Sequence, residues 1–417
     1  MMIYNLVFKN TFLLLLFTII TYGNYKKSIQ LSDDSIWMVN SKYQKKESFL
    51  LKEGGVLTGA DNSSIYLPLL KDKRVGIVTN QTGILHDGTH LVDFLIDHKI
   101  SIQKIYAPEH GFRGTADAGE LIKDGKDYKT GLPIISLYGN NKKPKSEQLD
   151  GIEVMVFDLQ DVGVRFYTYI SSLHYVMEAC AENNIPLLVL DRPNPNGNII
   201  DGPVLETEFK NFVGMHPVPV LYGMTIGEYA NMINGEKWLK NGIECKLKII
   251  SCKNYKRGMF YDLPVNPSPN LPNHQAINLY ASLCFFEGTN VSVGRGTEKQ
   301  FQIYGSPYLT ENDFTFTPLP NLGAKDPLWN GKVCYGQDLS RIEKVKQLEL
   351  KWVIKAYKEN SQTMNPFFNS FFTKLAGTKK LQQQIERGVS EKEIRKSWKK
   401  DLLKFKHIRL KYLNMEY

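Results

Sequence analysis

The chain has 417 residues, of which 42% are hydrophobic and 32 are glycine, an ordinary composition for a globular protein that argues against a disordered chain. This length exceeds what one compact core usually serves, so we expect two domains. The formal net charge is +9, but the lysines are scattered and do not alternate with aromatic residues as in nucleic-acid binding surfaces. We therefore predict no nucleic-acid partner and interpret the lysine-rich C-terminal stretch as a solvated helix face.

The first segment has the pattern of an export signal. Lys9 precedes an apolar run over residues 11–20, and Thr21-Tyr22-Gly23 resembles a cleavage site. Because this run is too short to cross a bilayer comfortably, we predict a signal peptide over residues 1–23 and no stable membrane span after its removal. An uncleaved anchor is the alternative.

Residues 24–61 are polar and irregular and are predicted to be a linker. Short apolar runs with helical patterns between them follow, which is typical of buried parallel strands in an α/β domain. The predicted strands are 75–79, 102–106, 134–137, 154–157 and 187–190.

The rhythm changes beyond residue 201, where we expect a second domain. Thr225 and Glu228 have the spacing of a capping box at a helix start. Residues 390–405 are predicted to form a helix that packs through one apolar face. The proline-rich segment 266–272 can form neither a helix nor an inner strand. It is either a spacer or a wall of a site.

The cysteines and histidines indicate no metal centre. Five cysteines cannot all pair, and neither CxxC nor HExxH occurs. Cys245 and Cys252 are close enough in sequence to form a disulfide across a turn, but we expect buried, unpaired cysteines. The chain also lacks Gly-x-Ser-x-Gly, a Walker loop, and a dinucleotide fingerprint after the first strand, so no cofactor is predicted.

Polar residues follow every predicted strand. In open α/β sheets, ligands bind outside the carboxyl ends of the strands, so these residues predict one site. The alternative is that each is a helix cap or turn former, which suits asparagine and aspartate better than glutamate. The residues concerned are Asn80 and Gln81, Glu109 and His110, Tyr138, Asp158, and Asp191 and Arg192.

Glu109 is the first candidate for catalysis. It lies between Pro108, which restricts the backbone, and His110-Gly111. A carboxylate on such a loop is suited to general acid catalysis. The alternative is a structural Glu-His pair that closes the loop.

Three further clusters carry polar chemistry. In residues 158–169, Arg165 is suited to bind a carboxylate through two hydrogen bonds, with an internal salt bridge to aspartate as an equal alternative. Residues 191–197 combine hydrogen-bonding groups with prolines, as carbohydrate sites require. Residues 287–290, together with Arg295, are expected to close the site from the second domain.

These segments, taken in order, resemble the motifs of the NamZ-type exo-β-N-acetylmuramidases. The similarity extends from about Leu67 to the C-terminus. The matching segments are VGIVTNQTG at 75–83, PEHGF at 108–112, DLQDVGVRFYTY at 158–169, LDRPNP at 190–195, SPNLP at 268–272, EGTN at 287–290 and GRGT at 294–297.

The resemblance implies a Rossmann-like parallel sheet domain over residues 62–205 and a smaller α+β C-terminal domain over 206–417, with the site in a cleft between them. It implies a bacterial glycoside hydrolase, periplasmic or secreted, that releases N-acetylmuramic acid from the non-reducing ends of peptidoglycan fragments. Glu109 falls in the motif that carries the family's proposed catalytic glutamate. A non-catalytic exported protein that binds wall sugars is the alternative.

The implied substrate carries a lactyl carboxylate, so a cationic pocket is expected, with Arg113, Arg165, Arg192 and Arg295 as candidates. Cleavage also needs a second group, either an aspartate or the substrate's own N-acetyl oxygen. The predicted catalytic residues are Glu109, Asp158 and Tyr167, and the predicted substrate-binding residues are Asn80, Gln81, His110, Arg113, Gln160, Asp161, Arg165, Asp191, Arg192, Asn194, Glu287, Asn290 and Arg295.

Overall fold

The computed structural model describes residues 55–112, 124–360 and 364–417. The predicted signal peptide, nearly all of the predicted linker and Arg113 therefore lie outside the described residues.

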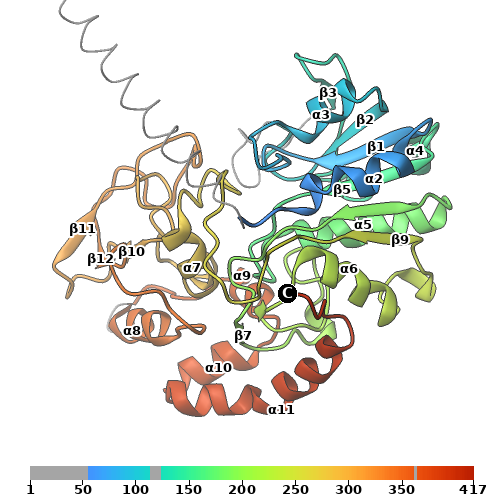
Figure 1. The fold of residues 1–417 in the computed structure, drawn as a ribbon. Coiled ribbons are helices and arrows are strands. Elements are labelled where there is room, and N and C mark those ends of the chain that lie inside the picture. The colour runs from blue at the N-terminus through green and yellow to red at the C-terminus, as the bar shows by residue number, and fades with distance from the viewer. Residues whose placement is uncertain (1–54, 113–123, 361–363) are drawn as a thin grey trace, which may run out of the picture. The chain divides into compact units, whose positions relative to one another are not determined.

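The main element is a seven-stranded sheet with the strand order β3-β4-β2-β1-β5-β6-β9 (Figure 1). Every neighbouring pair is parallel except β3 and β4. Its strands are β1 Arg74–Thr79, β2 Ser101–Ala107, β3 Gly125–Lys126, β4 Pro133–Ser136, β5 Val154–Asp158, β6 Leu187–Leu190 and β9 Leu247–Ile250. The five predicted strands are confirmed, and the last strand of the sheet comes from beyond residue 205.

Helices cover both faces of this sheet, which explains why β1, β5 and β6 are almost entirely buried and mainly apolar. On one face, Val75 and Ile77 pack with side chains of α2 and α3. On the other, Val78 and Phe157 pack with α5 and α6. These helices are α2 Ser63–Leu70, α3 Leu91–Asp97, α5 Tyr169–Glu182 and α6 Ile226–Gly235. Leu149 of the short helix α4 Ser146–Leu149 belongs to the same cluster as Val78 and Phe157.

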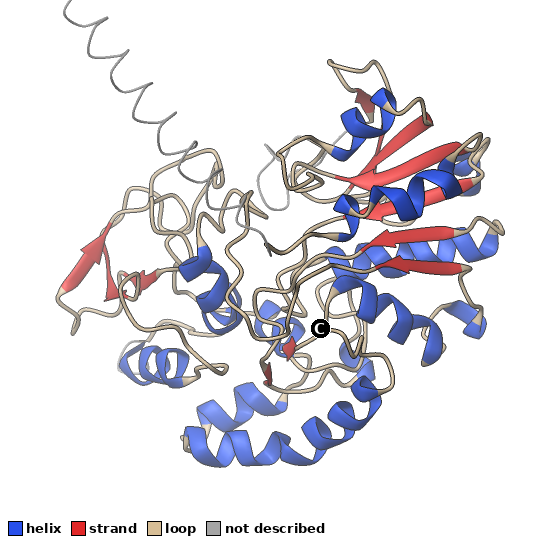
Figure 2. Cartoon of the chain, viewed as in Figure 1, coloured by secondary structure: helices blue, strands red, loops and turns tan. Residues whose placement is uncertain are grey.

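The C-terminal part contains a small antiparallel sheet and several helices, so the predicted fold class is confirmed. The strands are β10 Ile303–Ser306, β11 Phe314–Phe316 and β12 Cys334–Asp338, in the order β10-β12-β11. The helices are α7 His274–Leu283, α8 Lys351–Asn360, α9 Phe371–Ala376, α10 Lys380–Glu386 and α11 Glu391–Leu410, and a ribbon of β7 Ile200–Asp201 and β8 Leu221–Tyr222 precedes them. Long loops connect these elements (Figure 2).

One hydrophobic cluster joins the two parts of the chain. It contains Val78 of β1 and Leu173 of α5, together with Phe285, Phe372 of α9 and Trp398 of α11. The C-terminal part therefore packs directly against the helix-covered sheet and holds the loops at the carboxyl ends of the strands in place.

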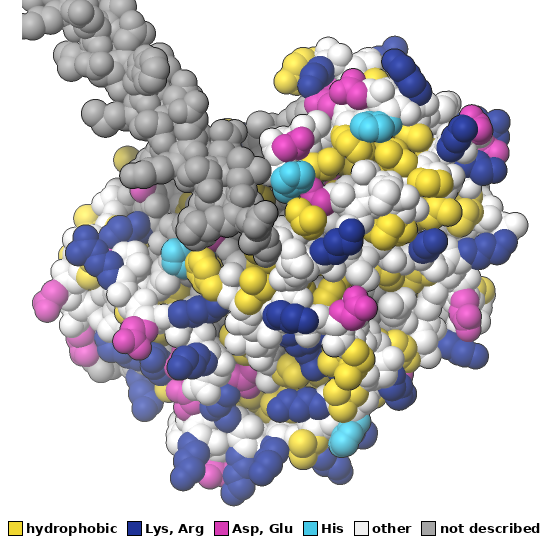
Figure 3. All heavy atoms as spheres, viewed as in Figure 1, with side chains coloured by type: hydrophobic (Ala, Val, Ile, Leu, Met, Phe, Trp, Pro, Cys, Tyr) yellow, Lys and Arg dark blue, Asp and Glu magenta, His cyan; other side chains and the backbone are white. Residues whose placement is uncertain are grey.

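Several local predictions are confirmed. Thr225 and Glu228 form a capping box at the start of α6. All five cysteines are free and buried. The lysines of α11 point outwards (Lys392, Lys396, Lys399, Lys400, Lys404 and Lys406), and Figure 3 shows basic side chains along the edge where Figure 1 places this helix. Within the described ranges, no helix is long and apolar enough to cross a membrane.

Candidate active site

Glu109 lies on a sharp turn after β2, at the N-terminal end of α5. His110 and Gly111 both have positive φ angles, 73° and 76°, and the Gly111 amide donates to the Pro108 carbonyl. Pro108 and His110 are buried, whereas Glu109 is only half-buried. The turn therefore buries the residues on either side of Glu109 and leaves the Glu109 side chain partly exposed.

Thr168 fixes this carboxylate. Its hydroxyl Oγ1 donates to Glu109 Oε2 at 2.8 Å. Thr168 is the N-cap residue of α5, yet its side chain makes no capping hydrogen bond, although such a bond usually stabilises a helix by about 1 kcal/mol. The cap is given up in favour of the contact with Glu109, which also lies where the helix dipole favours negative charge.

Tyr169 connects the ends of β1 and β2. Asn80 Nδ2 donates to the Tyr169 hydroxyl at 2.6 Å, and this hydroxyl lies 3.4 Å from the Glu109 carbonyl oxygen. Asn80 Oδ1 accepts from the backbone and side chain of Thr82. The sequence prediction placed Asn80 beside Glu109 correctly, but it missed Thr168 and Tyr169 as the residues that connect them.

The proline-rich segment forms a wall of this region. Gln81 Nε2 donates to the Asn266 carbonyl at 3.2 Å, and the Tyr167 hydroxyl donates to the Pro267 carbonyl at 2.7 Å. Burial raises the pKa of Tyr167 well above its ordinary value, so the hydroxyl keeps its proton. Of the two interpretations offered by the sequence, the wall is the one that the structure supports.

A row of aromatic rings leads from Tyr167 into the C-terminal part. Tyr167 meets Tyr280 edge to face at 6.2 Å, and Tyr280 meets Phe301 at 4.9 Å. The Arg295 guanidinium lies 5.1 Å from the Phe301 ring, and its Nε donates to Glu287 Oε1 at 2.7 Å. The side chains of Arg295 and Glu287 are 23% and 24% exposed, so both are partly exposed.

Asp158 and Arg192 form a buried ion pair. Arg192 donates through Nε and Nη2 to the two carboxylate oxygens, at 2.6 and 2.9 Å, and Nη2 also donates to the Ile84 carbonyl at 3.0 Å. Asp158 is fully buried. The pair joins the ends of β5 and β6. The Asp158 carboxylate and the Arg192 guanidinium, both predicted to bind or cleave substrate, therefore bind each other.

Arg165 lies away from Glu109, in the interior. It is fully buried, and burial lowers its pKa to about 9. Among the described residues it contacts no carboxylate, so the structure shows neither the predicted salt bridge nor an accessible carboxylate-binding group. Its Nη1 and Nη2 atoms donate at 2.7–2.9 Å to the carbonyls of Pro203, Val218, Leu375 and Ala376.

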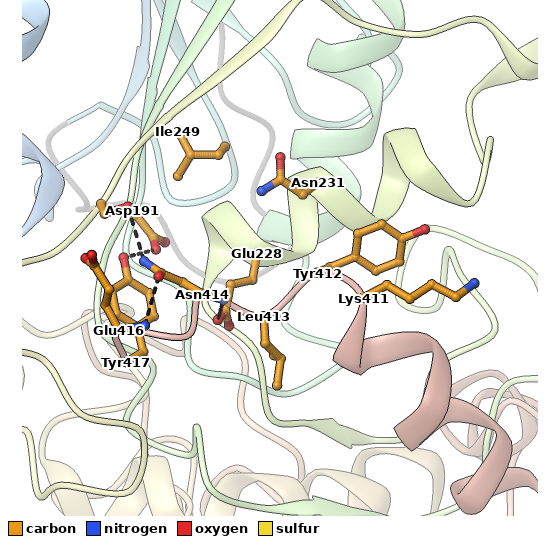
Figure 4. Close-up of a pocket in the computed structure, with 11 residues that line it drawn as sticks. Asp191, Glu228, Asn231, Ile249, Lys411, Tyr412, Leu413, Asn414, Glu416 and Tyr417 are labelled. Carbon is orange, nitrogen blue, oxygen red and sulfur yellow. Dashed lines mark hydrogen bonds between the residues drawn. The ribbon is translucent and has the colours of Figure 1, made fainter.

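The polar groups of residues 191–197 are also used internally. Asp191 accepts from the Gly227 amide and the Thr225 hydroxyl, both at 2.8 Å, which caps α6. It also accepts from the Tyr417 hydroxyl at 2.7 Å, beside a cavity of about 520 Å³ whose lining residues do not include Glu109 (Figure 4). Asn194 Nδ2 donates to the Met224 carbonyl.

Two remaining candidates, Gln160 and Asn290, also bind other parts of the chain. Gln160 is buried and donates to the Asp161 and Pro193 carbonyls. Asn290 Nδ2 donates to Asn360 and to the Pro366 carbonyl. The structure therefore brings together Glu109, His110, Asn80, Gln81 and Tyr167, connects Glu287 and Arg295 to them through aromatic rings, and uses the other described candidates mainly as internal supports.

Asp161 is a buried carboxylate with one unsatisfied oxygen. Its Oδ2 accepts from the Gly163 amide at 2.7 Å and from the Tyr222 hydroxyl, whereas Oδ1 has no hydrogen-bond partner within the described part of the chain. Burial raises the pKa of Asp161 to about 6, and the two hydrogen bonds offset part of this effect.

This pKa predicts a pH-dependent stability. An aspartate in the unfolded chain titrates near pH 4, so between about pH 4 and 6 the folded state holds a proton that the unfolded state has lost, and the stability from this group falls as pH rises. We expect the Tm of wild type minus the Tm of Asp161→Asn to fall from pH 4 to pH 6.5, because only the wild type loses this stability. Asp338→Asn is the control, because hydrogen bonds from Lys299 and Ser340 hold the pKa of the partly buried Asp338 below its ordinary value, so the same Tm difference should not fall as pH rises over this range.

Comparison with known proteins agrees with the motif resemblance. Residues 75–275 match the family described as exo-beta-N-acetylmuramidase NamZ, N-terminal, and residues 278–414 match its C-terminal counterpart. The chain belongs to the NamZ family. It is 40% identical over 387 residues to the peptidoglycan beta-N-acetylmuramidase NamZ of Bacillus subtilis (strain 168). This alignment covers 87% of this chain and 92% of that protein.

Two crystal structures of DUF1343 family proteins from Bacteroides fragilis NCTC 9343 have the same fold. One is 43% identical, with a TM-score of 0.80, and the other is 28% identical, with a TM-score of 0.73. Each comparison covers 86% of this chain and 98% of the other protein. The family predicted from the motifs is thereby confirmed.

Proposed function

We propose that this chain is an exo-acting glycoside hydrolase that releases N-acetylmuramic acid from the non-reducing ends of peptidoglycan fragments. The observation that carries the proposal is the half-buried Glu109 carboxylate, oriented by Thr168 at the carboxyl end of a parallel sheet. Its family and the activity named for its Bacillus subtilis relative support the same reaction.

Glu109 acts as the general acid in this proposal. Its proton passes to the glycosidic oxygen as the bond from that oxygen to C1 of the muramic acid breaks. Water then adds to C1 and returns a proton to the Glu109 carboxylate. Thr168 fixes the orientation of the carboxylate, which this proton transfer requires.

The second group is the N-acetyl oxygen of the substrate itself. Asp158 is fully paired with Arg192, and Asp161 is buried behind its bonds to Gly163 and Tyr222. Both aspartates are therefore poorly placed to attack C1 or to activate water. The acetamide oxygen attacks C1 as the leaving oxygen departs, and water, deprotonated by Glu109, opens the resulting ring.

Arg295 binds the lactyl carboxylate. Of the four arginines that the sequence suggested, Arg113 lies outside the described residues, and Arg165 and Arg192 are buried and used internally. Arg295 is partly exposed and pairs through Nε with Glu287, itself partly exposed. A carboxylate of the substrate would meet the remaining donors of this guanidinium.

The chain works outside the cytoplasm, where its substrate lies. The apolar segment within residues 11–20 supports export to the periplasm or the medium. We also propose that the signal peptide is cleaved after residue 23.

The test is the release of free N-acetylmuramic acid from a β-1,4-linked N-acetylmuramic acid–N-acetylglucosamine disaccharide by purified protein without residues 1–23. We expect both monosaccharides in equal amounts, and no cleavage of the reversed disaccharide with N-acetylglucosamine at its non-reducing end. A protein that binds the first disaccharide without cleaving it would be a sugar-binding protein.

A further inference from the structure

The loop over residues 317–333 is far longer than its position requires. It connects β11 to β12, which are antiparallel neighbours in one sheet. Such neighbours are usually joined by about 2–5 residues. Long loops that are nevertheless held in place are commonly functional.

Three segments of the site region hold this loop. Asn270 Nδ2 donates to the Gly323 carbonyl at 2.6 Å, the Leu319 amide donates to the Gly296 carbonyl at 2.9 Å, and Trp329 Nε1 donates to the Asn290 carbonyl at 2.8 Å. Gly296 has a φ of 78°, and a Cβ there would lie 2.6 Å from the Leu319 carbonyl oxygen. Only glycine permits this close approach of the loop.

The anchoring segments are the same ones that carry the site. Asn270 follows Pro267, the acceptor of the Tyr167 hydroxyl, by three residues. Asn290 follows Glu287, and Gly296 follows Arg295. The loop is therefore hydrogen-bonded to the segments that also carry Glu287, Arg295 and the acceptor of the Tyr167 hydroxyl.

The loop exposes four large aliphatic side chains among charged and polar ones such as Lys325, Asp326 and Lys332. Its exposed fractions are 57% for Leu319, 69% for Leu322, 45% for Leu328 and 49% for Val333. Four exposed aliphatic side chains within one anchored loop are more than single scattered ones and favour a binding role for the loop.

Trp329 lies within this loop in a strained conformation. Its φ is 66°, a left-handed angle that is rare for a bulky residue and concentrates at functional sites. The half-buried indole is held by its bond to Asn290 and by the Tyr308 ring, edge to face at 5.4 Å. The Lys332 ammonium lies 5.2 Å from the ring centre.

We propose that loop 317–333 extends the substrate-binding site, and that Trp329 binds the sugars beyond the bond that is cleaved. This proposal rests on the proposed function, in which only the terminal muramic acid enters the catalytic site and the rest of the glycan strand must lie outside it. The apolar faces of the sugar rings pack on the indole and the neighbouring leucines. The exposed Lys332 adds positive charge for muramic acid carboxylates further along the strand.

The test compares kcat/KM on two substrates that differ in length. One is a tetrasaccharide of two N-acetylmuramic acid–N-acetylglucosamine units, and the other is a 4-nitrophenyl N-acetylmuramic acid glycoside. We expect Trp329→Leu to lower the ratio of tetrasaccharide to aryl-glycoside kcat/KM by about tenfold, as expected for the loss of one aromatic contact. Trp329→Phe keeps a ring and should retain the ratio within about threefold.

Phe260→Leu is the matched control. Phe260 is 62% exposed, and a lysine, Lys344, lies 5.9 Å from its ring, but it lies outside the loop. Phe260→Leu should therefore leave the ratio of kcat/KM between the two substrates unchanged. An equal loss of kcat/KM on both substrates in Trp329→Leu, or no loss on either, would overturn the proposal. So would a wild-type protein that is a dimer in solution and becomes a monomer in Trp329→Leu, because the loop would then bind a second copy of the chain. A wild-type protein inactive on both substrates would instead refute the proposed function itself.

Discussion

Glu109→Gln is expected to lower the rate of N-acetylmuramic acid release from the disaccharide by roughly 10³-fold, within the range of general acid–base catalysis. Glutamine has nearly the same shape and still accepts a hydrogen bond from Thr168 through its amide oxygen. It cannot donate a proton to the leaving oxygen. Substrate binding, measured by calorimetry with the inactive variant, should change by less than about threefold in Kd, because the lost contribution belongs to the transition state.

The leaving group gives this prediction a second readout. A 2,4-dinitrophenolate departs without protonation, so Glu109→Gln should lose far less of the bond-cleavage rate on a 2,4-dinitrophenyl glycoside than on the disaccharide. Glu147→Gln, on the exposed face of α4, is the control and should match the wild type on both substrates. If Glu109→Gln turned over the disaccharide at a near-wild-type rate, Glu109 would not be the acid.

The fold was largely predictable, because buried strands have a strong apolar signal. Four of the five central strands are short, mainly apolar runs, and β2 also contains Gln103 and Lys104. β9, Leu247–Ile250, escaped prediction because it is an edge strand with the exposed Lys248 in it, so its apolar run is interrupted. The strands β10 to β12 are short and contain polar residues and glycines, which leaves little local signal.

The candidate site was predictable only in part. The sequence shows which polar residues follow each strand, but not whether their side chains face a ligand or the interior. Glu109 is half-buried and bonded to Thr168, and Gln81 reaches Asn266, whereas Asp191 caps α6 and Asn194 binds a neighbouring loop. Thr168 had a signal in its position before α5, yet a helix cap was the simpler interpretation of such a residue.

Arg165 shows the limit of sequence reasoning most clearly. Its partners at Leu375 and Ala376 are more than 200 residues away in the chain, at separations of 210 and 211. An arginine beside two aspartates in sequence indicates a salt bridge or a ligand site, and only the tertiary structure reveals that four carbonyl groups surround it.

Arg165→Met is therefore expected to destabilise the protein severely without a selective effect on the substrate. The change leaves four buried carbonyl oxygens without these donors, and each unsatisfied group costs about 1–3 kcal/mol. Removing the buried charge recovers part of this loss, so we expect a net loss of roughly 5 kcal/mol, comparable to the whole stability of many domains. Urea unfolding would measure the loss, and an insoluble variant would agree with it.

The control and the substrate preference decide between a structural and a binding role for this arginine. Arg74→Met removes an exposed arginine, 3.7 Å from Glu153, and should cost at most about 1 kcal/mol. Folded Arg165→Met protein should retain the wild-type ratio of kcat/KM between substrates with and without the lactyl carboxylate, because the guanidinium contacts only the carbonyls of its own chain. Arg295→Met should reduce that ratio, since its side chain is partly exposed. Wild-type stability combined with a lost preference in Arg165→Met would assign the lactyl carboxylate to Arg165 and contradict this structural role.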